Sequence, residues 1–253
     1  MISSRGRSGR PVGWLRLLRT TPVLLVLACA VLFSIPTLRA FDRWFIHENG
    51  PVEMSTFLSF LAAGFFATRA LWPARARGAS GLVLLMVAGF AACSFVAALE
   101  EISWGQSLAH FASPPGWERF NVQDETNLHN LDGVQNLHSF LLFAIGAVGL
   151  ALSVLSRRAG GLLRAPHVVS VCFAIVAVLG GLDWWTDNFP FGDPADTVIG
   201  MLTEVNEMVL SLGLMAYAFD LRTRVRPLRG RRTVPEPRLA RSMPAGGSID
   251  AGI

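Results

Sequence analysis

Two glutamates, Glu204 and Glu207, lie inside the last long apolar segment of the chain, residues 198–219. The twelve residues that follow Glu207 before Asp220 form about 18 Å of helix, too short to cross a hydrocarbon core of about 30 Å. If this segment spans a membrane, both carboxylates lie within the span, where each costs on the order of 3 kcal/mol. Their spacing places them on one helix face. Such a burial requires partners from other helices, and partners of this kind indicate a site.

Ten further side chains could take part in catalysis or binding. They lie near the ends of apolar segments or in the long polar segment between the third and fourth of them: Glu100, Glu101, Trp104, Gln106, Glu125, Asn127, His129, Asn130, His138 and Asp183. Glu100 and Glu101 are adjacent, so we expect only one of the two to face the other helices. Glu125 and His129 are four residues apart and share a face if residues 124–132 are helical. A carboxylate beside a histidine either fixes the imidazole tautomer or joins it as a metal ligand.

These residue types are able to bind a divalent transition metal, because carboxylate oxygen and imidazole nitrogen suit Zn, Fe or Mn. The metal ligands predicted on this basis are His129, His138, Glu204 and Glu207. The candidates for acid–base catalysis are Glu100, Glu101, Glu125 and Asp183. The candidates for substrate binding are Trp104, Gln106, Asn127 and Asn130. The chain lacks the Glu-x-x-His motif of di-iron bundles, so that template is matched in residue type but not in spacing.

The composition indicates that the elements positioning these residues are membrane helices. Apolar residues make up 52% of the chain, charged residues only 16%, and the mean hydropathy is +0.45. Soluble domains carry about 25% charged residues. Six segments approach or exceed a spanning length, at residues 22–38, 52–72, 81–99, 137–155, 168–185 and 197–219. Because only helices satisfy their own backbone in lipid, we predict an all-α bundle of about six transmembrane helices.

The basic residues predict the orientation of this bundle. All 22 are arginines, and only Arg39, Arg43 and Arg119 lie in the other loops. Arg69 lies near the end of the second segment, and the rest lie in the two tails, the second loop or the fourth loop. We therefore expect a bacterial inner membrane protein with both termini in the cytoplasm. Most acidic residues lie toward the other side. The arginines beside the membrane indicate contact with anionic lipid headgroups and not with nucleic acid.

The domain organisation follows from these segments. Residues 1–21 form a basic cytoplasmic tail, residues 22–220 form the transmembrane domain with a long non-cytoplasmic loop at 100–136, and residues 221–253 form an Arg/Pro-rich tail expected to be disordered. The first apolar segment resembles a signal peptide as well as a membrane anchor. Because residues 37–40 make a poor cleavage site, we favour an uncleaved anchor, and cleavage would leave five spans. The three cysteines all lie in apolar segments and are expected to pack as small apolar residues.

The start of the second segment, residues 53–59, places a Glu and a Ser as the CREST membrane hydrolases do, the group of the alkaline ceramidases and the PAQR receptors. The resemblance covers about ten residues and implies zinc-dependent hydrolysis of a lipid amide. Two departures stand against it. CREST proteins have seven spans, and their last span carries a His-x-x-x-His motif where this chain has Glu204-x-x-Glu207. The segments 100–106 and 121–130 are also similar to motifs of uncharacterised bacterial multi-pass proteins, which implies no function.

Two functions from different classes agree with these residues. The first is a metal-dependent hydrolase or related lipid-modifying enzyme in the membrane, open to the non-cytoplasmic side. The second is a proton- or cation-coupled transporter, because intramembrane glutamates are common ion relays. Against the transporter, no charged residue is seen deep in the cytoplasmic half of any predicted span. A non-catalytic assembly or sensor subunit is a third possibility.

Overall fold

The chain is an all-α, multi-pass membrane protein. The computed structural model describes residues 20–47, 49–119, 121, 126–128, 131, 133–134 and 137–225. Within these residues, five helical stretches are long and apolar enough to cross a membrane. The spanning helices are α4 (Pro51–Ala76), α5 (Gly81–Glu101), α7 (His138–Ala159), α8 (His167–Asn188) and α9 (Asp193–Val225). They match five of the six predicted segments and confirm the predicted helical bundle.

The remaining predicted segment, the first in the chain at residues 22–38, is interrupted. Helix α2 (Thr21–Phe33) is followed by the 3-10 helix η1 (Pro36–Leu38) and by the short helix α3 (Arg39–Ile46). Pro36 accounts for the end of α2, because a proline disfavours a helical conformation in the residue before it. The 13 residues of α2 extend about 20 Å, less than the thickness of a hydrocarbon core. Residues 1–19, which include most of the predicted basic tail, lie outside the described residues.

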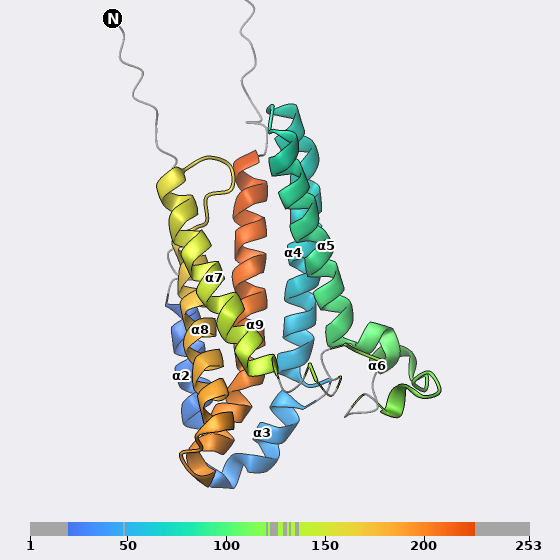
Figure 1. The fold of residues 1–253 in the computed structure, drawn as a ribbon, viewed down its shortest axis with the longest axis vertical. Helices are drawn as coiled ribbons and strands as arrows, with labels where there is room; N and C mark the ends of the chain where they lie inside the picture. Colours follow the sequence, from blue (N-terminus) through green and yellow to red (C-terminus); the bar gives the residue numbers. More distant parts are fainter. Residues whose placement is uncertain are drawn as a thin grey trace, which may run out of the picture.

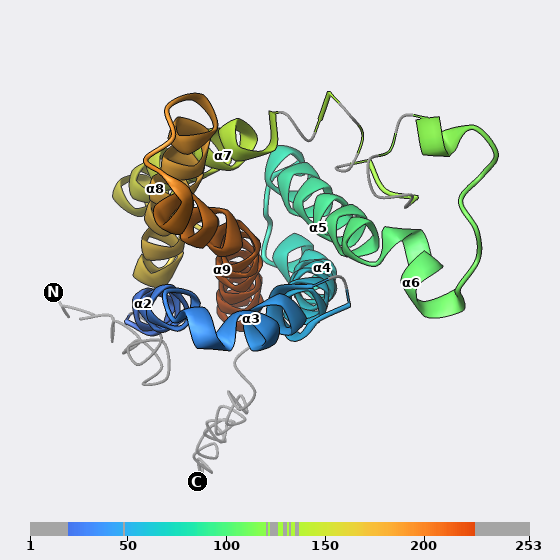
Figure 2. The same ribbon diagram turned by 90° about the horizontal axis from the view of Figure 1, so that it is seen from below.

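The spanning helices pack in an open arc in the order α5, α4, α9, α8, α7. Figures 1 and 2 show α9 at the centre of this arc, with α4 and α5 on one side and α8 and α7 on the other. Helices α2 and α3 lie against the outer side of the arc, where they contact α8, α9 and α4. Within the described part of the chain, no extensive packing joins α5 to α7. The two ends of the arc therefore leave an opening between these helices.

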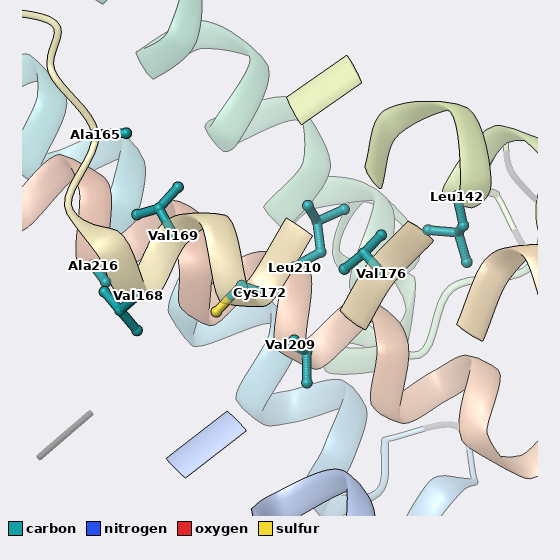
Figure 3. Packing of buried hydrophobic residues seen from close by; sticks show 9 residues of the cluster. All are labelled: Leu142, Ala165, Val168, Val169, Cys172, Val176, Val209, Leu210 and Ala216. Carbon is teal, nitrogen blue, oxygen red and sulfur yellow. The ribbon is translucent and has the colours of Figure 1, made fainter. Parts of the chain in front are cut away.

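The core between α7, α8 and α9 consists of small and branched apolar side chains, among them Val176, Val209 and Cys172 (Figure 3). Glycines set the distance between α7 and α8. A Cβ atom at Gly146 would lie 2.3 Å from the backbone nitrogen of Ala177 on α8. A Cβ atom at Gly180 would lie 2.6 Å from the backbone nitrogen of Phe143 on α7. The two backbones are in direct contact, which fixes the position of α7 relative to α8.

We call the end of the bundle at which α5 ends and α7 begins the acidic end, and the opposite end the arginine-rich end. At the arginine-rich end, α9 continues to Val225, five residues past the predicted domain limit at 220. Arg224 stabilises this extension. Its guanidinium is 2.9 Å from Asp220 and donates hydrogen bonds to the carbonyls of Leu162 and Arg164 in the α7–α8 connection. Residues 226–253, the rest of the predicted tail, lie outside the described residues.

Candidate functional site

Four spanning helices each bring an acidic or imidazole group to the acidic end of the bundle. Glu101 is the last residue of α5, His138 is the first residue of α7, and Glu53 lies in the first turn of α4. Helix α9 contributes Glu204 and Glu207. These five residues form what we call the carboxylate cluster. It lies at the opening of the arc, because α5 and α7 are the two helices that flank this opening.

The closest contact in the carboxylate cluster joins α7 to α9. The His138 Nε2 atom lies 2.6 Å from the Glu207 Oε1 atom, and both side chains are mostly buried, with exposed fractions of 27% and 18%. This distance is that of a strong hydrogen bond, and it becomes an ion pair when the imidazole is protonated. Glu207 therefore faces another helix and not the acyl chains of the bilayer. The pair also fixes which imidazole nitrogen points at the carboxylate.

Glu101 is surrounded by other carboxylates. It interacts electrostatically with Glu207, Glu204 and Glu53, and also with its neighbour Glu100. Two like charges 4 Å apart repel by about 4 kcal/mol at an effective dielectric constant near 20. Such an assembly is stable only when protons, a metal ion or a cationic ligand offset the negative charge. The carboxylate cluster therefore needs one of these forms of compensation.

Asp183 joins α8 to the carboxylate cluster through hydroxyl groups. Its Oδ2 atom accepts a hydrogen bond of 2.7 Å from Ser139 on α7 and one of 2.8 Å from Thr203 on α9. Ser139 also lies 3.1 Å from the Oδ2 atom of Asp187, because α8 continues past its two tryptophans and places both aspartates on one face. Asp183 interacts electrostatically with His138. This network ties the ends of α7, α8 and α9 together beside the cluster.

Glu100 points away from the cluster, as expected for one of two adjacent glutamates. Its carboxylate accepts hydrogen bonds from the Trp104 indole at 2.5 Å and from the backbone N–H of Leu128 at 2.6 Å. These bonds support an unusual turn, the 3-10 helix η2 (Ser103–Gly105), in which three successive residues have φ values of 47°, 56° and 92°. The left-handed conformation costs roughly 1–2 kcal/mol for each non-glycine residue. The turn directs the chain sharply outward from the end of α5.

Hydrogen bonds made by side chains also connect the two halves of the segment that follows η2. After helix α6 (Gln106–Ala109), the Gln106 carboxamide oxygen accepts a 2.7 Å hydrogen bond from the backbone N–H of Thr126. The buried Asn127 side chain donates to the Ser103 hydroxyl at 3.2 Å and lies 3.3 Å from the Asn121 amide nitrogen. Trp104, Gln106 and Asn127, predicted to bind substrate, thus take part in bonds that fold this segment.

The structure brings together Glu101, His138, Glu204, Glu207 and Asp183 of the predicted site. It places Glu100, Trp104, Gln106 and Asn127 in the adjoining polar segment. The remaining predicted members, Glu125, His129 and Asn130, lie outside the described residues. Within the described residues, no three His, Cys, Asp or Glu side chains stand in a metal-binding arrangement. Three of the four predicted ligands, His138, Glu204 and Glu207, are described and do not form such a group, and the fourth, His129, lies outside the described residues.

Sequence reasoning missed three contributors. Glu53 belongs to the segment that resembles the CREST hydrolases but was not among the predicted site residues, and it interacts electrostatically with Glu101. Ser139 and Thr203 hold Asp183. Two signals could have identified the hydroxyls, because Ser139 adjoins His138 and Thr203 precedes Glu207 by four residues, one helical turn on the same face.

Comparison with known proteins adds no assignment, since no family model, curated protein or solved structure matches this chain.

Proposed function

We propose that this protein is a metal-dependent hydrolase or related lipid-modifying enzyme of a bacterial inner membrane, with its acidic end on the non-cytoplasmic side. One observation carries this proposal. Glu101, Glu204 and Glu207 converge with His138 from three different spanning helices. Oxygen and nitrogen donors of this kind suit Zn, Fe or Mn. A divalent cation would also offset the mutual repulsion of the carboxylates.

The residues of the site fit separate roles. Glu204, Glu207 and His138 would hold the ion together with His129, which is a proposal from the sequence alone. A bound ion of this class lowers the pKa of its water and so supplies the nucleophile of hydrolysis. Glu101, a further carboxylate of the cluster, would accept and return a proton. Asp183 would position the start of α7, because Ser139, the hydroxyl that donates to it, is the neighbour of His138.

Two further features support this reading. Glu53, the first residue of the segment that resembles the CREST hydrolases, interacts electrostatically with Glu101. The site also lies at the ends of α5 and α7, the level at which the ester or amide linkage of a membrane lipid would be presented to a site in the protein. A lipid substrate would reach it without leaving the bilayer.

Elemental analysis of the detergent-purified protein tests the proposal. We expect about one or two equivalents of transition metal in the wild-type protein, and loss of most of it in Glu207→Gln, Glu204→Gln and His138→Ala. The matched control is Asp193→Asn, which removes an exposed carboxylate from the same helix and should retain the metal. A folded wild-type protein without metal would contradict the proposal.

A proton- or cation-coupled transporter is the second candidate, and the His138–Glu207 pair favours it because such pairs relay protons within membranes. The arginine-rich half of the bundle argues against a transporter. Among the described residues of the spanning helices, Asp220 is the one acidic residue at the arginine-rich end, and Arg224 is bound to it. Under this reading, Glu207→Gln abolishes a pH-dependent flux in liposomes while the wild-type protein contains no metal.

A further inference from the structure

The opening of the arc contains a cavity that belongs to neither the carboxylate cluster nor the polar segment. It has a volume of about 500 Å³ and lies between α5 and α7, and α9, α8 and the α7–α8 connection also line it. Its wall is almost entirely apolar and includes Met86 and Phe90 of α5, Leu152 of α7, and Leu214 and Tyr217 of α9. We call this cavity the lateral cleft. It lies in the half of the spanning helices nearer the arginine-rich end, and its lining reaches the end of α7 at Ala159.

The lateral cleft and the carboxylate cluster are flanked by the same helices. Glu101 and Phe90 both belong to α5 and are eleven residues apart, about 16 Å along a helix. His138 and Gly149, which lines the cleft on α7, are separated by the same number of residues. Glu207 and Leu214 on α9 are seven residues apart, about 10 Å. The cleft therefore begins below the cluster and extends away from it toward the arginine-rich end.

No charged residue separates the two features. On α5, residues 91–99 are apolar except Ser94, whose hydroxyl is bonded to the Phe90 carbonyl at 2.8 Å. On α7, residues 140–148 are all apolar or glycine. A hydrocarbon chain that passes along the opening from the cluster meets no polar barrier, whereas water would gain no hydrogen bonds there. The opening is suited to a molecule that is polar at one end and apolar along its length.

We propose that the lateral cleft binds the hydrocarbon chain of a membrane lipid whose polar end lies at the carboxylate cluster. This inference rests on the proposed function and names its substrate class, a long-chain lipid that enters sideways between α5 and α7. The chain must be long. Half of a hydrocarbon core is about 15 Å, and the cleft begins on α5 about 16 Å from Glu101. A chain must therefore extend past the middle of the bilayer to enter the cleft.

Photo-crosslinking tests this inference on the full chain in detergent. The probe is a stearoyl phospholipid with a diazirine near the methyl end of its chain, and the cross-linked peptides are mapped by mass spectrometry. We expect labelling at residues 86–90, 149–159 and 214–221. Excess unlabelled stearoyl lipid should remove most of it, and a hexanoyl lipid with the same headgroup should remove little. Equal competition by both lipids would overturn the inference.

A matched pair of substitutions separates cleft binding from general contact with lipid. Leu152 lines the cleft, whereas Val178 on α8 does not, and both side chains are 61% exposed. Leu152→Trp should lower cleft labelling at least fivefold, and Val178→Trp should leave it within twofold of wild type. Met86→Trp provides a second obstruction from α5. Labelling that follows exposure over α7 and α8, and that Leu152→Trp leaves unchanged, would contradict the proposal.

The same experiment distinguishes this inference from the proposed function. Glu207→Gln should lose its metal and keep saturable labelling of the cleft. Saturable labelling of a metal-free wild-type protein would retain the lipid site and reject the hydrolase. A metal-containing protein whose labelling does not saturate would reject the lipid site and retain the hydrolase.

Discussion

At the scale of single residues, the site depends on a contact between two groups that each need the other. The His138 imidazole and the Glu207 carboxylate are 2.6 Å apart and largely withdrawn from solvent. Removing one partner takes this mostly buried hydrogen bond from the other side chain. Each single change is therefore expected to destabilise the protein.

A double-mutant cycle measures this dependence. His138→Ala and Glu207→Gln should each lower the free energy of unfolding by about 1–3 kcal/mol, because each removes the hydrogen bond between the two side chains. The double variant should lose less than the sum of the two. Unfolding in detergent at fixed pH, followed by circular dichroism, provides the measurement. Additive losses would mean that the two side chains do not interact.

The sequence was sufficient to predict that Glu207 of α9 faces another helix. Two glutamates inside an apolar span have few stable arrangements, so their orientation toward other helices followed from the cost of burial. The same argument failed for Glu53, because a carboxylate in the first turn of a helix is also stable in solvent. Its interaction with Glu101 depends on the packing of α4 against α5 and α9, which no local pattern specifies.

At the scale of elements, glycines in α7 control the alignment of the site. Gly146 brings the backbones of α7 and α8 into contact, and this contact sets the position of Ser139 relative to Asp183. A side chain at this position would force the helices apart. The effect would be felt two turns away, at the first residues of α7.

Two alanine substitutions test this role. Gly146→Ala should destabilise the protein by about 1–3 kcal/mol, because the added methyl group overlaps the backbone of α8. The control is Gly89→Ala in α5, where no heavy atom lies within 4 Å of the added group. It should be neutral or stabilising by up to about 1 kcal/mol, since alanine favours a helix more than glycine does. Thermal unfolding of both variants gives the comparison, and equal destabilisation would reject the explanation.

The predicted boundaries of the helices agreed with the structure where the length of the apolar segment determined them. They differed where a single side chain determined the boundary. Pro36 shortens the first segment, and Arg224 extends the last helix beyond the apolar region through bonds to the α7–α8 connection. Hydropathy does not register either effect. The packing order of the helices, and with it the opening between α5 and α7, could not be predicted because all the helices are apolar on several faces.

At the scale of the whole molecule, acidic groups gather at one end of the bundle and arginines at the other. The positive-inside rule then predicts that the arginine-rich end faces the cytoplasm. Two exposed alanines at opposite ends of the bundle allow a test of this orientation. Ala112 lies in the polar segment at the acidic end, and Ala76 lies at the end of α4 at the arginine-rich end. Each is replaced by cysteine in a background in which Cys29, Cys93 and Cys172 are alanine.

A membrane-impermeant maleimide applied to intact cells should label Ala112→Cys and not Ala76→Cys, and lysis should make both reactive. The reverse pattern would show that the acidic end faces the cytoplasm. In that case the proposed substrate would arrive from the inner leaflet, although the cluster and the lateral cleft would keep their relation to each other.

The left-handed turn at the end of α5 provides a way to identify homologues of this protein. Substitutions on apolar faces drift readily, so hydropathy alone would identify a distant homologue poorly. The backbone at positions 103–105 permits far fewer amino acids, because β-branched residues and proline do not adopt such φ values. A homologue would therefore be expected to keep glycine at position 105 and serine, asparagine or aspartate at position 103, directly after a membrane helix that ends in acidic residues. A search pattern written from that constraint would reach further across genomes than one written from the helices.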